Sequence, residues 1–497
     1  MADKRRKTAE ALHGAITNSK RPRLQLSDLP MDVLCSVLSQ LPMEEAVKTS
    51  ILSCQWKYIW CHQTSLNFNC KTIMPRVAWS TREAVRQEFI KRVNAVLRQR
   101  NGAGVEKMNI RFDLDDRHAA DVDRWVNLAI ASKTKVLTLE LWLDSPAIVY
   151  RLRVSDPERM EPYNFPFQLF DECNGSHLRS LHLSTVSLKL PTNFKGFLNL
   201  KKLYLSGVSI TDEDLGHFVS KCSVLEFLGV LFCTMLETLT IPHSANQLKH
   251  LQIRCCPLLH KVRLNYSLKM LVYKGPVTYF VSDRTSSLTD ACINLLDVRT
   301  SLKHLFAELS GSTSCPKSVA TKCRDLERSI PPRSSTCFLG LRHVKLEVTI
   351  LVSSESGTDV LDLGHLLKAA PSMEKLELHM WMRRKHKPYC RDDGDLRILP
   401  AHPHSHLKLV HITGFYGHKD QLELADHILR NCVVLEEMKV DPRVAIEKLS
   451  TSEDEYEESR NLDGLRVASE FLHDADRHGA LTVSLSLPRP KVTMIWI

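Results

Sequence analysis

The sequence lacks the cysteine spacing that would indicate a disulfide framework or a structural zinc site. Its fifteen cysteines include no Cys-x-x-Cys pair, and Cys255 and Cys256 are adjacent. An odd number of scattered cysteines is typical of reduced thiols, whereas zinc sites need ligands two to four residues apart. We therefore expect the cysteines to be reduced core and loop residues.

Long apolar runs are also missing. The longest uncharged one, from Phe227 to Leu236, is well short of the ~18 residues that a membrane span needs. The basic residues near the start of the chain are not followed by an apolar stretch, so they do not form a secretory signal. We expect an intracellular protein, in the nucleus, the cytoplasm or both, with no membrane partner.

No catalytic motif is present. The sequence contains no glycine-rich phosphate loop, no His-Glu-x-x-His and no Gly-x-Ser-x-Gly, which are the short motifs of nucleotide, zinc-protease and hydrolase sites. The strongest metal candidate is a histidine group near Cys390, but Pro403 and the following strand pattern favour a solvated loop. We expect no catalytic residue, no metal and no cofactor. The group comprises His402, His404, His406 and His411.

The net charge of +10 is unevenly distributed. Residues 1–23 carry seven basic and two acidic side chains, which is half of the excess. The remaining charge is too dilute to form the focused basic face that nucleic acid requires. The tail itself has the two-cluster layout of a nuclear import signal, although a basic arm without an address fits equally well. The two clusters are Arg6 and Lys7, then Lys20, Arg21 and Arg23.

The segment after the tail predicts three short helices. Ser27 or Asp28 can cap the first, Pro30 fits its first turn, and Pro42 ends it. A third segment brings Trp56 and Trp60 to helical spacing. A unit this small retains exposed apolar surface and needs a partner. The apolar face of the first helix consists of Val33, Leu34, Val37, Leu38 and Leu41.

Two Leu-Pro pairs, the run from Glu45 to Ser53, and Trp56 with Trp60 make residues 26–68 resemble a plant F-box. The family usually has an acidic residue at the position of Met31 and basic residues at those of Cys54 and Gln55. The resemblance implies that a Skp-type adaptor docks here and links the chain to a cullin scaffold. The implied adaptor-binding residues are Leu29, Pro30, Leu34, Leu38, Leu41, Pro42, Val47, Ile51, Leu52 and Trp56.

A Leu-x-x-Leu-x-Leu pattern then recurs. Copies start at Leu178, Leu200, Leu225 and Leu248, at offsets of 22, 25 and 23 residues, and a weaker one starts at Leu268. These offsets are typical of leucine-rich repeats, in which a short strand turns its leucines inward. The segment 210–222 predicts a capped helix between two strands. Further copies start near residues 341, 373, 407 and 435.

The C-terminal copies resemble the FBD region of plant F-box proteins, most clearly in the helix, Asn-Cys and Leu-Glu-Glu-Met arrangement of residues 425–440. We predict an α/β fold, namely a three-helix F-box followed by an irregular leucine-rich-repeat solenoid, which is a curved parallel sheet with helices on its convex side. The expected divisions are 1–23 basic tail, 24–68 F-box, 69–310 linker and repeats, 311–336 loop, 337–442 FBD region continuing the repeats, and 443–497 a C-terminal segment without assignment.

Together these resemblances imply a non-catalytic substrate receptor of a cullin-type ubiquitin ligase. The F-box would bind the adaptor, and the repeats would hold a target protein that the sequence does not identify. The alternative hypothesis is a nuclear repeat scaffold or nucleic-acid-associated protein that uses its basic tail. The dilute charge outside residues 1–23 disfavours this alternative.

Overall fold

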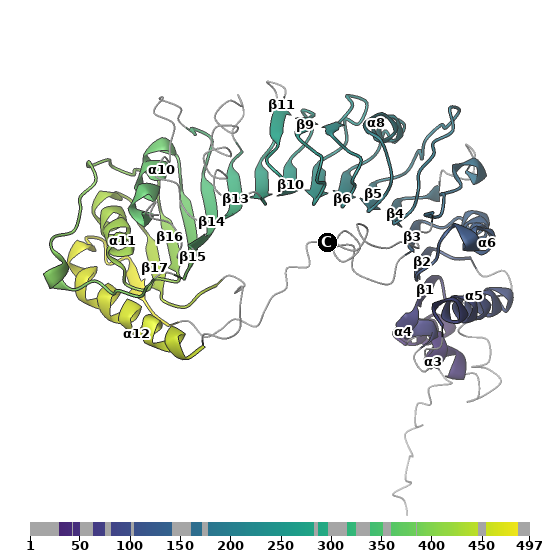
Figure 1. Cartoon of the computed structure of the whole chain (residues 1–497), viewed down its shortest axis with the longest axis horizontal. Helices are drawn as coiled ribbons and strands as arrows, with labels where there is room; N and C mark the ends of the chain where they lie inside the picture. Colours follow the sequence, from purple (N-terminus) through teal and green to yellow (C-terminus); the bar gives the residue numbers. More distant parts are fainter. Residues whose placement is uncertain are drawn as a thin grey trace, which may run out of the picture. The chain divides into compact units, whose positions relative to one another are not determined.

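The computed structural model describes most of the chain in two compact units, residues 1–108 and 109–497 (Figure 1). The described ranges are 29–41, 43–49, 63–74, 81–100, 104–141, 161–170, 177–282, 287–296, 316–324, 338–350, 359–383, 385–445 and 454–485.

The first unit is mainly helical. Pro30 is the N-cap of α2, and Thr81 caps α5 by accepting a 3.2 Å hydrogen bond from the Ala84 N–H. The carbonyl oxygen of Thr64 accepts hydrogen bonds from the N–H groups of Glu106 and Lys107, which lie in the same unit. Its helices and strand are α2 (Met31–Ser39), α3 (Met43–Lys48), β1 (Ser65–Asn69), α4 (Cys70–Ile73) and α5 (Arg82–Arg98).

The second unit is built on a parallel sheet in which each strand pairs with the next one along the chain, apart from three that form a small sheet of their own. In order, the strands of the main sheet from the start of this unit are β2 (Lys107–Arg111), β3 (Val136–Glu140), β4 (Ser180–Ser184), β5 (Lys202–Ser206), β6 (Phe227–Leu231), β8 (His250–Arg254), β10 (Met270–Gly275), β12 (Asp290–Leu295), β13 (Ser318–Arg324), β14 (His343–Ile350), β15 (Lys375–Met382), β16 (Leu409–Thr413), β17 (Glu437–Asp441) and β18 (Leu481–Val483).

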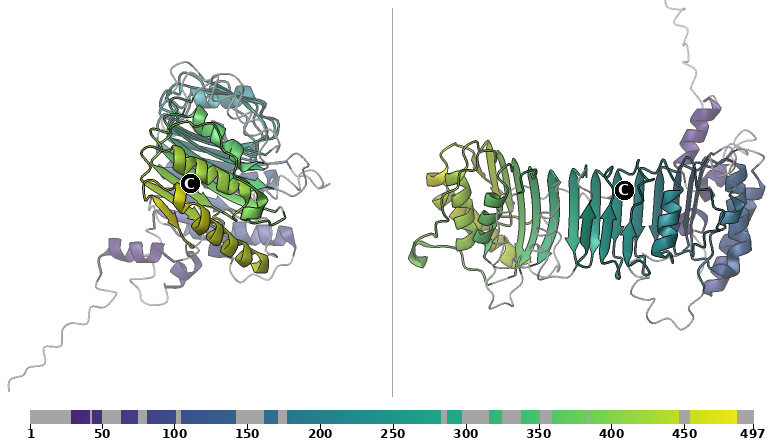
Figure 2. Two further views of the ribbon diagram at one scale, coloured as in Figure 1. Left: turned by 90° about the vertical axis from the view of Figure 1, so that its left-hand side faces the viewer. Right: turned by 90° about the horizontal axis from the view of Figure 1, so that it is seen from above.

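Helices and the small sheet lie on the convex face of the main sheet, the face toward which the buried side chains of its strands point (Figures 1 and 2). Thr211 caps α8, whose first turn carries three acidic residues that favour the positive end of the helix dipole. The predicted helix at 210–222 is therefore confirmed. These elements are α6 (Ala119–Ala131), α8 (Asp212–Ser220), β7 (Thr238–Thr240), β9 (Lys261–Leu264), β11 (Tyr279–Ser282), α10 (Gly364–Ala369), α11 (Lys419–Asn431) and α12 (Asp454–Phe471), with short 3-10 turns η4 (Asp116–His118), η5 (Phe167–Leu169), η7 (Val360–Leu363), η8 (Arg391–Asp393) and η9 (His473–Ala475).

The leucines of the repeat pattern form the core, because alternate residues of a strand point to opposite faces of the sheet. Leu181 and Leu183 of β4 are fully buried, as are Leu203 and Leu205 of β5. Burying one such side chain stabilises the fold by roughly 1.5–3 kcal/mol. The predicted α/β repeat fold is confirmed in this part of the chain.

The residue directly after a repeat strand often has a left-handed backbone, with positive φ at Thr185, Gly207, Phe232, Cys255 and Gly414. At Gly414 a Cβ would lie 1.9 Å from the carbonyl oxygen of Met380, so the position requires glycine. This conformation turns the chain away from the sheet at the same point of these repeats, which keeps the strands in register.

The loop predicted at 311–336 is wrong over part of its length, because β13 pairs in parallel with both β12 and β14. Val319, Thr321 and Cys323 point inward and are buried. They stand where the other repeats have leucine. The alternation of buried and exposed residues is therefore present in β13, but without the leucines by which the repeats are recognised. After residue 442, a segment that the sequence left unassigned, α12 and β18 extend the repeat stack.

Among the described residues, no helix combines the length and the apolar composition that a bilayer crossing requires.

Candidate functional site

Helix α2 has one buried and one exposed apolar side. Leu34 and Leu38 are 0% and 1% exposed, so they belong to the core of the first unit. Side chains four residues apart lie on one side of a helix, so Val33 and Val37 share a side that differs from that of the buried pair. Leu41, just after the end of the helix, is also exposed. Met31 joins them on the exposed side, and these four residues are called the α2 stripe below. Their exposed fractions are 49% for Met31, 40% for Val33, 42% for Val37 and 42% for Leu41.

The predicted adaptor-binding residues are thus divided by the structure. Pro30 and Leu41 are exposed and Leu29 is half-buried, whereas Leu34 and Leu38 are buried within the chain and offer no free surface. Met31, Val33 and Val37 were not among the predicted adaptor-binding residues. Val33 and Val37 were predicted to share one apolar face with Leu34, but that prediction is wrong, because the first unit buries Leu34 and leaves Val33 and Val37 exposed. Outside the description lie Pro42, the Val47 side chain, Ile51, Leu52, Trp56 and the five basic residues of the predicted import signal.

In the second unit, the strand side chains that point away from the core form the face of the sheet that no helix covers in the described residues, which is called the outer face below. In-register parallel pairing places them in rows across the strands, for example His182, Tyr204, Gly229 and Gln252. Rows of this kind juxtapose residues more than twenty positions apart in the sequence, at the strand spacing of about 4.8 Å.

Aromatic side chains cluster on the outer face of β4, β5 and β6. The ring centroids of His182 and Tyr204 are 5.3 Å apart, and those of Tyr204 and Phe227 are 4.5 Å apart. Gly229 makes room for this contact, because a Cβ there would lie 2.7 Å from Cδ1 of Tyr204. The three rings, which we call the aromatic cluster, are half-buried, and half-buried aromatic groups are typical anchors of protein interfaces.

The electrostatics of this cluster follow from partial burial. Burial lowers the pKa of His182, even though its Nδ1 lies 3.5 Å from a carboxylate oxygen of Glu140. Burial also raises the pKa of Tyr204. Both side chains are therefore held in their neutral forms, which suits contact with an apolar or neutral partner surface.

A second cluster on the outer face is charged and surrounds Glu377 of β15. Its carboxylate lies 2.5 Å from the ammonium of Lys375, 3.2 Å from Nε2 of His343 and 3.6 Å from Nε2 of His379. The two histidines, followed by Lys375, hold the pKa of Glu377 well below its usual range. Nδ1 of His379 is 2.9 Å from Oγ1 of Thr413, which fixes its ring on the sheet.

The histidine group considered as a metal site is spread over different environments. The rings of His402 and His404 are 5.5 Å apart, but His406 is exposed and His411 lies on β16, where its ring contacts that of His379. In the part of the chain that the structure describes, no three side chains of His, Cys, Asp or Glu are arranged to hold a metal ion. Cys390 instead lies 3.3 Å from a carboxylate oxygen of Asp393.

Comparison with known families matches two parts of the chain. Residues 26–67 match the F-box domain, and residues 96–481 match the leucine-rich-repeat domain described as At1g61320/AtMIF1. The second match covers more than half of the chain and contains both clusters of the outer face.

The relatives are plant proteins of the same organisation. The F-box/FBD/LRR-repeat protein At5g56420 of Arabidopsis thaliana is 24% identical over 85% of this chain and 92% of its own length. The F-box/FBD/LRR-repeat protein At1g13570 of the same species is 27% identical over 46% of this chain, and the match spans about half (48%) of that relative. Among solved structures, the LRR protein LIC12759 of Leptospira interrogans is similar to 73% of this chain and 95% of its own, at 13% identity and a TM-score of 0.28. The chain belongs to the plant F-box/FBD/leucine-rich-repeat family.

Proposed function

We propose that this chain is the substrate-receptor subunit of a cullin-type ubiquitin ligase. The observation that carries the proposal is that one chain combines an F-box, whose helix α2 exposes an apolar stripe, with a repeat sheet whose outer face exposes half-buried aromatic groups. F-box domains generally bind Skp-type adaptors. The α2 stripe would contact the adaptor, and through it the cullin scaffold.

The outer face of the repeat sheet would hold the target protein. Tyr204 and Phe227 offer large, rigid and partly desolvated surfaces, the kind of residue that dominates binding energy at protein interfaces. The chain would form and break no bond itself. Its contribution would be proximity, since a tethered target lysine meets a charged conjugating enzyme at a high effective concentration.

The adaptor contact is tested with the purified full chain and a Skp-type adaptor from its own organism. We expect M31D/V37D, which places two charges on the α2 stripe, to weaken adaptor binding at least about tenfold, or about 1.4 kcal/mol. L258D is the matched control, because Leu258 is 54% exposed but lies in the second unit. Titration calorimetry measures the affinity and circular dichroism checks the fold. If the wild-type chain binds no Skp-type adaptor, the receptor hypothesis fails at its first step.

The target contact is tested by comparative affinity purification. Y204A/F227A should lose target proteins that the wild-type chain retains, while both retain the adaptor. Equal recovery of every partner by both proteins would remove the aromatic cluster from the proposal without affecting the adaptor contact.

A further inference from the structure

A second feature of the repeat sheet lies at the edge where its strands begin. The residue directly before each of β3, β4 and β5 is basic, namely Lys135, Arg179 and Lys201. The N–H of Arg179 donates to the carbonyl oxygen of Lys135, and the N–H of Lys201 to that of Arg179, both at 2.8 Å. Backbone pairing therefore stacks three cationic residues at the strand spacing of about 4.8 Å.

These three residues line a cavity of about 550 Å³ together with Lys133, His177 and Asn199. The lining residues include four permanent cations and no carboxylate. Glu226, next in the row, lies 2.9 Å from the ammonium of Lys201 and offsets one of these charges. The lining side chains other than His177 are exposed, so the cavity is an open groove on the surface. We call this cavity the basic groove.

Lys133 occupies an unusual backbone position in the groove. It follows the end of α6 with φ of +56°, and its N–H donates to the carbonyl oxygen of Ile130 at 2.9 Å. Glycine or asparagine usually stands at a left-handed helix end, because a side chain is disfavoured there. A strained backbone position is a reason to examine a residue for function. Here the strained residue adds a positive charge to the groove.

Several cations around one small cavity favour a ligand with concentrated negative charge. A single carboxylate offers one charge and two oxygens, whereas a phosphate group carries nearly two charges and three strong acceptors. The planar guanidinium of Arg179 can bind such a group through two parallel hydrogen bonds. The lysines would act as point charges beside it.

We propose that the basic groove binds a phosphate-bearing ligand, either a free polyphosphate or a phosphorylated peptide segment. Both sources present the same chemistry to the groove. The site lies on the repeat sheet, away from the α2 stripe in the sequence. A test of phosphate binding is therefore independent of the proposed receptor function.

The proposal is tested by titration calorimetry of the full chain with inorganic tripolyphosphate. We expect saturable binding that K135A/R179A weakens at least about tenfold. K249A/K269A is the matched control, since both lysines directly precede later strands in the same row but do not line the groove. Absence of binding to tripolyphosphate and to a doubly phosphorylated peptide, or an equal loss in the control, would overturn the proposal.

Two further measurements separate binding from structure and identify the ligand source. K133G should raise the melting temperature, because glycine relieves the strained backbone, and should weaken tripolyphosphate binding; a variant that melts higher and binds normally would contradict the role of Lys133. Tighter binding of the phosphorylated peptide than of tripolyphosphate would assign the site to a modified target, and the reverse to a free ligand. Tighter binding of duplex DNA than of either would overturn the proposal in favour of nucleic-acid association.

Discussion

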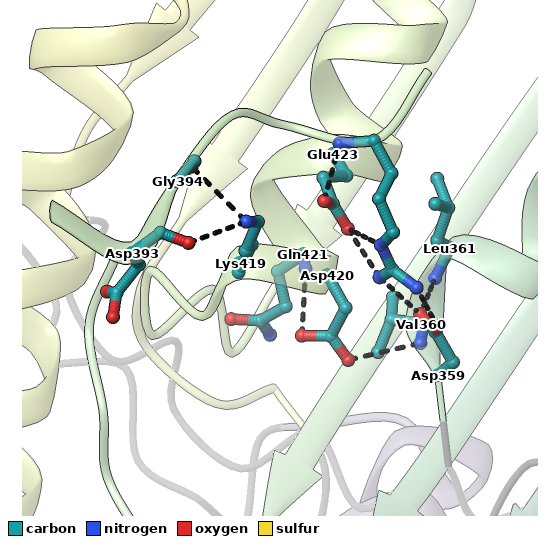
Figure 3. Close-up of polar contacts among 10 residues, drawn as sticks. Asp359, Val360, Leu361, Asp393, Gly394, Lys419, Asp420, Gln421 and Glu423 are labelled. Atoms are coloured by element: carbon teal, nitrogen blue, oxygen red, sulfur yellow. Dashed lines mark hydrogen bonds and ion pairs between the residues drawn. The ribbon is translucent and has the colours of Figure 1, made fainter. Parts of the chain in front are cut away.

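The most demanding stability prediction concerns Arg397, which joins its own segment to η7 and α11 through hydrogen bonds to Asp359 and Glu423. Figure 3 shows these two carboxylates and the neighbouring Asp420. The backbone N–H and Nε of Arg397 donate to Glu423 of α11 at 2.7 and 2.9 Å, and its Nη1 donates to Asp359, the N-cap of η7, at 2.5 Å. The hydrogen bonds to Glu423 raise the pKa of Arg397 most, and those to Asp359 contribute the next largest share. Nearby, Asp420 accepts from the N–H of Val360 at 3.1 Å, which holds η7 on the same helix.

The magnitude follows from unequal burial. The side chain of Glu423 is 0% exposed, whereas that of Arg397 is 52% exposed. R397A therefore leaves a buried carboxylate without its cation, and breaking a buried pair in this way costs about 3–5 kcal/mol. The contact of Arg397 with Asp359 is more exposed and adds less than about 1 kcal/mol.

The assay is denaturant unfolding with hydrogen exchange at α11, because a repeat stack need not unfold in a single step. K408A is the matched control, since Lys408 and Glu436 form a 2.7 Å pair with both side chains more than half exposed, and we expect it to cost less than about 1 kcal/mol. Adding E423Q to R397A should restore part of the loss by removing the buried charge. If R397A lowers the free energy of unfolding no more than K408A does, burial of Glu423 does not determine the cost of losing its cation.

Three other predictions concern the aromatic cluster, the acid sensitivity of the second unit and the basic tail. G229A should displace the Tyr204 ring, since the new Cβ would lie 2.7 Å from Cδ1; the near-ultraviolet circular dichroism should change, and an unchanged spectrum would show that the cluster does not depend on this glycine. Acid should destabilise the second unit through His404, because burial, followed by the charge of His427, lowers its pKa from 6.5 to about 4. Because the pKa of His404 is lower in the folded state than in the unfolded state, the folded state binds fewer protons between pH 6.5 and 4. The free energy of unfolding should therefore be highest above pH 6.5 and fall as the pH drops towards 4, by at most about 1.4 kcal/mol per pH unit. Unfolding curves at pH 7.5, 5.5 and 4.5 should show this decrease, and H404Q should reduce the pH dependence of the unfolding free energy. Finally, alanine at the second cluster of the predicted import signal should shift a fluorescent fusion from nucleus to cytoplasm, and an unchanged distribution would leave the tail without an address. That cluster is Lys20, Arg21 and Arg23.

The sequence by itself determined the repeat architecture, because that architecture depends on local alternation. The Leu-x-x-Leu-x-Leu copies became β4, β5, β6 and β8, and the capped segment after Ile210 became α8. β13 was missed because Val319, Thr321 and Cys323 fill the inward positions where leucine was expected. Valine, threonine and cysteine can occupy the buried positions of a strand, but they give a weaker repeat signal than leucine does.

Only the tertiary structure decided which surfaces are free to bind. The periodicity of the segment predicted Leu34 and Val37 on one apolar face, but the packing of the first unit buried Leu34 and left Val37 exposed. Likewise, Lys135 and Arg179 are 44 positions apart in the sequence, and Arg179 and Lys201 are 22 positions apart. They line one groove only because parallel strands pair in register, and a register is a relation between distant segments that no local pattern encodes.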